Sequence, residues 1–150
     1  MYRAQNLERA LPKLPFILDP AIAGLTAVAE AMFPANSYGA PDWREAEVVP
    51  RTLAYLEELP AMPRRLLLAL FTAVELSAPV LVGCRSRFSR LPAGRRAEAI
   101  RALQASQFSP KRLIGDALKA TLTMMYVSHP KVMAHIGEHP GGVHAVGVPK

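Results

Sequence analysis

Three of the four histidines in this 150-residue chain lie in one short stretch near its end, SHPKVMAHIGEHPGG. They are His129, His135 and His139, and His144 follows shortly after. If a helix covered the second half of the stretch, His135 and His139 would share one face, because residues four apart on a helix are neighbours. Glu138 could join them, and the order His-x-x-Glu-His is reminiscent of an inverted zinc-protease motif. A metal-dependent enzyme that uses these three side chains is therefore one hypothesis.

The residues around this histidine pair argue against a metal site. Gly137 weakens a helix at that point, and Pro140 and Gly141 end it directly after the second histidine. A true inverted motif lies inside a long helix and needs a distant third ligand. We therefore expect no metal ligands here, and we expect the C-terminal residues to form part of a subunit contact. The side chains predicted at that contact are His135, Ile136, His139 and His144.

The single cysteine, Cys84, excludes an internal disulfide and any zinc site built from several cysteines. Its neighbours in VGCRSR are basic, which makes it a weak candidate nucleophile, and a buried thiol is the simpler interpretation. The sequence has no Gly-x-Ser-x-Gly turn and no glycine-rich fingerprint for a nucleotide. We therefore predict that this chain has no catalytic, cofactor-binding or metal-binding residues of its own.

Basic residues are concentrated in the middle of the chain. Residues 64–112 hold ten Lys or Arg against two Glu, and five of the arginines lie in CRSRFSRLPAGRR. Arginine pairs well with phosphates and with the carboxylates of a protein partner. Because the segment lacks a helix-turn-helix spacing and stacked aromatics, we predict that Arg85, Arg87 and Arg90 face acidic side chains of a protein, without nucleic acid. A basic helical nucleic-acid-binding domain is the alternative.

Proline marks the starts of the elements that must position these side chains. It is favoured in the first turn of a helix, where its missing N–H would be unpaired anyway. Apolar residues recur at helical spacing after Pro20, Pro50, Pro63, Pro92 and Ser109-Pro110, and VLVGC is the only strand-like run. We predict an all-α fold, a compact bundle of five to six helices with proline-marked connections and an extended C-terminal tail. Its parts are an N-terminal arm (1–19), a helical domain (20–139) and the tail (140–150).

The same spacing predicts which helix faces turn inward. After Ser109, one stripe should be buried; its residues are Ile114, Ala117, Leu118, Thr121, Leu122 and Met125. After Pro92, Ile100 and Leu103 should face the core while the arginines face water.

The most apolar run, residues 66–82, is too short and too interrupted for a membrane span. Glu75 and Pro79 break it, so we expect a helix of the bundle that extends from Pro63 to residue 82. Half of all residues are apolar and only 20% are charged, which indicates that a partner covers part of the surface. The aromatic residues predicted at that contact are Phe33, Tyr38 and Trp43, in and beside the loop 34–42.

Three blocks resemble the gluconate 2-dehydrogenase subunit 3 family, in the order in which that family has them. LTAVAEAMFPANSYGAPD is similar to its opening, an amphipathic helix that ends in an apolar residue and proline before a Gly-Ala turn. RFSRLPAGRRAEAIRAL is similar to its middle element. LKATLTMMYVSHPKVMAHIGEHP is similar to its closing helix, turn and Ile-Gly pair, which indicates that the histidine-rich end is a structural turn.

The resemblance implies a small helical subunit without catalytic residues. Its partner would be a large FAD-binding oxidoreductase subunit of the glucose-methanol-choline type, which acts on an alcohol, sugar or sterol. The small subunit would stabilise that flavoprotein or help it to fold, and a cytochrome that accepts the electrons is a further expected partner. Exported members carry a twin-arginine signal, and residues 1–20 here contain none, so we expect a cytoplasmic chain. A periplasmic location would require a partner's signal.

Overall fold

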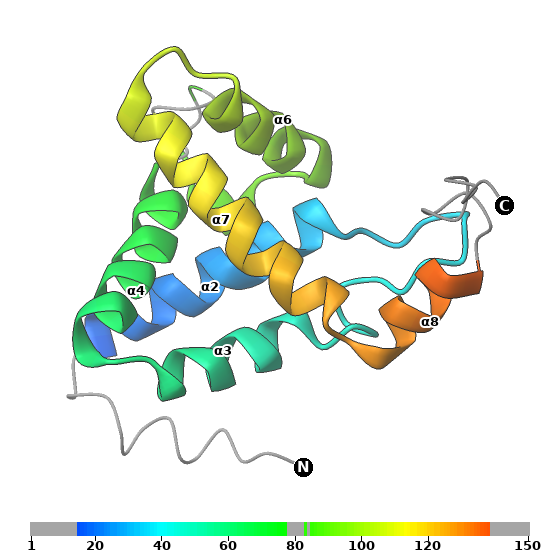
Figure 1. Ribbon diagram of the computed structural model, residues 1–150. Coiled ribbons are helices and arrows are strands. Elements are labelled where there is room, and N and C mark those ends of the chain that lie inside the picture. The colour runs from blue at the N-terminus through cyan, green and yellow to red at the C-terminus, as the bar shows by residue number, and fades with distance from the viewer. Residues whose placement is uncertain (1–14, 78–82, 84, 139–150) are drawn as a thin grey trace, which may run out of the picture.

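The computed structural model describes residues 15–77, 83 and 85–138, with side chains for residues 20–77, 83 and 85–137 (Figure 1). These residues form six α-helices and one 3₁₀ turn, and no strand occurs among them, which confirms the predicted all-α bundle. The elements are α2 (Pro15–Met32), α3 (Val48–Glu58), α4 (Ala61–Leu76), η2 (Phe88–Arg90), α6 (Ala93–Gln104), α7 (Ser109–Val127) and α8 (Pro130–Glu138). The predicted tail with His144 lies outside the described residues, and so does His139 just before it.

Two helix starts coincide with the predicted prolines: Pro92 is the N-cap of α6, and α7 begins at Ser109-Pro110. Helices α3 and α4 each begin two residues before the predicted Pro50 and Pro63, at Val48 and Ala61, and α8 opens at Pro130, which was not a predicted start. The helix that we expected to begin at Pro20 begins earlier, at Pro15, which leaves Pro20 inside it. Pro15 has the fixed φ that suits a first helical residue, so the helix gains a turn and loses one backbone hydrogen bond at Pro20.

The apolar helix α4 is shorter than predicted. It ends at Leu76, where the backbone N–H and the hydroxyl of Ser77 both donate to the carbonyl of Val74, at 3.1 and 2.8 Å. These two bonds satisfy a carbonyl that the end of a helix leaves unpaired. In the described parts of the chain, no helix has the length and hydropathy needed to cross a bilayer.

Helix α2 is the centre of the bundle. It packs most extensively against α4, and it also contacts α6 and η2, while α7 crosses over α2 and reaches α3 (Figure 1). The contact with α4 depends on Gly24, because a Cβ atom there would lie 2.3 Å from the carbonyl oxygen of Phe71. The helices therefore meet backbone to backbone at this point.

The inward faces follow the predicted periodicity. Leu118, Leu122 and Met125 of α7 are buried, and so are Ile100 and Leu103 of α6. The other large side chains that are almost completely buried include Leu25 and Val28 of α2, Phe71 and Val74 of α4, and Phe88 of η2.

Arg96 contradicts the prediction that the arginines of α6 face water. Its side chain lies one turn before Ile100 on the buried face, and only 8% of the residue is exposed. The Nη1 atom donates to a carboxylate oxygen of Glu30 at 2.8 Å, which ties α6 to α2. An arginine can be buried in this way because its stem packs on apolar neighbours while its guanidinium meets a carboxylate.

Candidate partner interface

Two of the aromatic residues predicted at the interface hold the base of the loop between α2 and α3. The ring of Phe33 stacks on that of Tyr126, with centroids 4.1 Å apart and planes 4° from parallel. The Trp43 N–H donates to the carbonyl of Phe33 at 2.9 Å, and the Tyr126 hydroxyl donates to the carbonyl of Pro41 at 2.7 Å. Phe33 and Trp43 are half-buried and pack against the core. Their main contacts are therefore within the fold.

The pKa of Tyr126 lies above its ordinary value of 10. Burial of the phenol is the largest cause, and the nearby carboxylates of Asp42 and Glu45 add to it. All three effects disfavour a phenolate at this site.

Replacing Tyr126 with phenylalanine should lower the free energy of unfolding by about 1 kcal/mol near neutral pH, because the hydrogen bond to Pro41 is lost. It should also change the response to alkali. The folded protein holds the phenolic proton more tightly than the unfolded chain, so this contribution to stability is present below pH 10 and is lost as pH rises above it. Urea unfolding at pH values below and above 10 should show that the free energy of unfolding falls more steeply with pH in the wild type than in Tyr126→Phe. If the two pH dependences were parallel, the raised pKa of Tyr126 would be wrong.

The third predicted aromatic residue, Tyr38, projects from the tip of the loop. It is 80% exposed, the highest value among the large apolar residues of the described chain. The side chain of Asn36 orders the turn around it. Its Oδ1 atom accepts from the N–H groups of Tyr38 and Ala40 at 3.0 and 3.2 Å, and its Nδ2 atom donates to the carbonyl of Ala40 at 3.1 Å.

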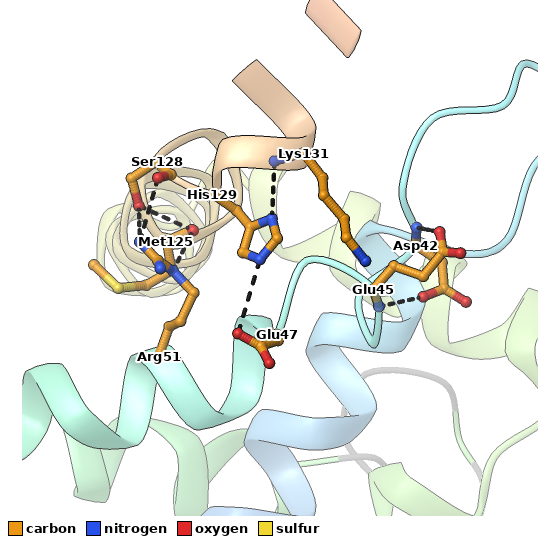
Figure 2. A network of polar contacts seen from close by, with 8 residues as sticks. All are labelled: Asp42, Glu45, Glu47, Arg51, Met125, Ser128, His129 and Lys131. Atoms are coloured by element: carbon orange, nitrogen blue, oxygen red, sulfur yellow. Dashed lines mark hydrogen bonds and ion pairs between the residues drawn. The ribbon is translucent and has the colours of Figure 1, made fainter. Parts of the chain in front are cut away.

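The joint between α7 and α8 is fastened to α3 by polar contacts (Figure 2). Arg51 of α3 donates to the carbonyl of Met125 at 3.3 Å and to the hydroxyl of Ser128 at 2.7 Å. The guanidinium thus lies at the C-terminal end of α7, where a cation is favoured by the helix dipole.

His129 is part of the same joint. It is only 8% exposed, and its Nδ1 atom accepts from the N–H of Lys131 at 3.3 Å, which caps the first turn of α8 (Figure 2). Its Nε2 atom lies 3.8 Å from a carboxylate oxygen of Glu47. Glu47 has a positive φ of 48°, unusual for a residue with a side chain. His129 therefore caps α8 and faces Glu47 at the N-terminus of α3.

Of the other three histidines, only His135 lies among the described residues. His135 is half-buried on α8, next to the exposed Ile136, whereas His139 and His144 lie outside the described residues. The described side chains, those of residues 20–77, 83 and 85–137, include no group of three His, Cys, Asp or Glu that could hold a metal ion. The side chain of Glu138, the acidic member of the candidate metal motif, lies outside them.

The arginine-rich segment has an inner and an outer side. Phe88 is fully buried, while Arg85, Arg87 and Arg90 are exposed. The segment is fixed to α4 by the buried carboxylate of Glu75, which accepts from the N–H of Ser89 at 2.9 Å and from its hydroxyl at 2.6 Å.

An apolar stripe runs along the outer side of α4, opposite the side that packs on α2. Met62, Leu66 and Leu76 in this stripe are 76%, 72% and 56% exposed, and the exposed Ala69 and Ala73 lie between them. The spacing alternates between four and three residues, which is the pattern of a helix seam that meets another helix. We call these five residues the outer stripe of α4. The helix was predicted from the sequence, but its exposed apolar face was not.

A second stripe with the same spacing follows the outer side of α7. It consists of Leu113, Ala117, Ala120, Met124 and Val127, and the three large side chains are 69%, 44% and 36% exposed. We call it the outer stripe of α7. This exposed face was not predicted, although the alternating spacing can be read from the sequence. Ala117, which was predicted in the buried stripe of this helix, is half-buried at the edge between the two faces.

Comparison with models of protein families, with curated proteins and with solved structures gives no match to this chain. Its own sequence and geometry are therefore the grounds for a function. The three blocks that carry the family resemblance form α2 with its loop, η2 with α6, and α7 with α8, and these elements contact one another in the core.

Proposed function

We propose that this chain is a non-catalytic helical subunit that binds the large subunit of an FAD-dependent oxidoreductase of the glucose-methanol-choline type. The oxidation of an alcohol, sugar or sterol would take place in the large subunit, which holds the FAD. The small chain would stabilise the folded flavoprotein, because a protein that binds the folded state and not the unfolded state shifts the equilibrium towards folding.

The observation that carries the proposal is the pair of outer stripes on α4 and α7. Each presents three large apolar side chains to solvent along a helix whose opposite side is already buried. Single exposed apolar residues are common, but aligned rows on rigid helices are typical of surfaces that bind another protein. Alanine in the middle of each stripe lets a partner helix approach closely.

The exposed arginines supply the polar part of such a surface. Arg85, Arg87 and Arg90 extend from a turn that Glu75 and Ser89 hold in place. Arginine is enriched at protein interfaces because its planar guanidinium can pair with a carboxylate through two hydrogen bonds. An acidic rim around an apolar centre is therefore the surface that we expect on the flavoprotein.

Co-expression with the glucose-methanol-choline-type flavoprotein of the same organism tests the proposal. The two chains should co-purify, and the flavoprotein should retain FAD and unfold at a higher temperature with the small subunit than without it. A chain that stays monomeric at micromolar concentration and leaves the flavoprotein unchanged would contradict the proposal. A gel shift of nucleic acid that weakens steeply with salt would instead support the basic nucleic-acid-binding alternative.

A further inference from the structure

The loop between α2 and α3 is ordered more strongly than a connecting loop requires. The side chain of Asn36 makes hydrogen bonds with four backbone groups, the carbonyls of Pro34 and Ala40 and the N–H groups of Tyr38 and Ala40. Gly39 has the positive φ, 73°, that lets the chain reverse there. The ring stack of Phe33 on Tyr126 and the bond from Tyr126 to Pro41 fix both sides of the base. The conformation of the tip is therefore set before any partner binds.

The ordered turn presents one large aromatic side chain, that of Tyr38, to solvent. Tyr38 is 80% exposed, and its neighbours at the tip are small or polar. Residues 34–41 carry no charge in a chain whose formal net charge is +6. Burying this tip against a partner would therefore desolvate no ionised group. The centres of protein interfaces are likewise depleted of charged residues.

We propose that the loop 34–42 is a preformed anchor that inserts the ring of Tyr38 into a pocket of the flavoprotein subunit. This inference rests on the proposed function and adds the residue on which the contact centres. The pocket should have apolar walls for the ring and a hydrogen-bonding group at its floor for the phenol hydroxyl. Asn36 is a positioning residue, because it acts by holding Tyr38 in the bound geometry.

The physical basis is the cost of ordering. A flexible loop loses conformational freedom when it binds, and that loss is subtracted from the affinity. Here the hydrogen bonds of Asn36 and the clamped base have already ordered the loop. Tyrosine on a rigid support is also one of the residues most often found to dominate a protein interface.

The test measures the dissociation constant of the complex between the flavoprotein subunit and variants of the full small chain. Tyr38→Ala should weaken binding by roughly 30-fold or more, the range of a dominant interface residue. Tyr38→Phe keeps the ring and should lose roughly 3- to 10-fold through the hydroxyl. Asn36→Ala should lose roughly 2- to 10-fold with Tyr38 still present.

Phe108→Ala is the matched control, since Phe108 is 61% exposed at the opposite end of α7, and it should change binding less than 3-fold.

A double variant separates positioning by Asn36 from a contact of its own. If Asn36 acts through Tyr38, the variant with both alanines should bind no more weakly than Tyr38→Ala alone. Amide ¹⁵N relaxation of the free chain gives a second readout, in which residues 38–40 should be as rigid as the helices and should loosen in Asn36→Ala.

The outcomes distinguish this inference from the proposed function. If the wild-type chain does not bind the flavoprotein, the proposed function is wrong and the inference falls with it. If the wild type binds and Tyr38→Ala binds equally well, or no worse than Phe108→Ala, the function stands and the anchor is refuted. Additive losses for Asn36→Ala and Tyr38→Ala, or a mobile loop in the free wild type, would refute the preformed geometry.

Discussion

Replacing Gly24 with alanine should destabilise the bundle by about 3 kcal/mol. The new Cβ would lie 2.3 Å from the carbonyl oxygen of Phe71 and 3.2 Å from its carbonyl carbon. These are backbone atoms of α4, so no side chain can rotate away, and the two helices must separate. Separation would loosen the most extensive helix contact of the described fold, around Leu25, Val28 and Val74.

Urea unfolding measures this effect, and Gly137→Ala is its control. Gly137 lies inside α8, and nothing lies within 4 Å of the Cβ that alanine would add. Alanine there should therefore stabilise the protein by about 0.5 to 1 kcal/mol through its higher helix propensity. If the two variants had similar stability, the close approach of α2 and α4 at Gly24 would be wrong.

The helices could be predicted from the sequence because two local signals agree. Prolines mark the first turns, and apolar residues recur at helical spacing after them, so α6 and α7 were expected, and their large apolar side chains Ile100, Leu103, Leu118 and Leu122 are buried as predicted. Only Arg96 of α6 departs from the predicted faces. The inward face of α4 could not be predicted in the same way. Its sequence is apolar nearly all the way round, and the face that turns inward is selected by the fit of Phe71 against Gly24 of α2.

Buried polar side chains mark a second limit of sequence reasoning. The partner of Arg96 is Glu30, 66 residues away, and Glu75 accepts its hydrogen bonds from Ser89. The residues next to Arg96 and Glu75 in the sequence do not indicate which distant side chain each will contact in the folded protein. For His129, the sequence predicted no contact partner. Its contact with Glu47 depends on the packing of α7 and α8 beside α3.

Placing a carboxylate on either outer stripe should abolish most of the affinity for the flavoprotein without affecting the free chain. Leu66 and Leu113 are 72% and 69% exposed, so glutamate at either position remains in water and should change the free energy of unfolding by less than about 0.5 kcal/mol. In the complex, the same carboxylate would be buried against an apolar surface without a counter-charge, which is far more costly. We expect Leu66→Glu and Leu113→Glu each to weaken binding by roughly 100-fold or more.

Ala102→Glu provides the matched control, because Ala102 is exposed on α6, away from both stripes, and the substitution adds the same charge. Its effect on the dissociation constant should stay within about 3-fold. Isothermal titration with the flavoprotein subunit measures all three variants. If only one of the stripe variants loses affinity, the partner covers one helix and the other stripe has a different role. If neither loses more than Ala102→Glu, the stripes do not face the flavoprotein, and the observation on which the proposed function depends would have to be explained by another partner.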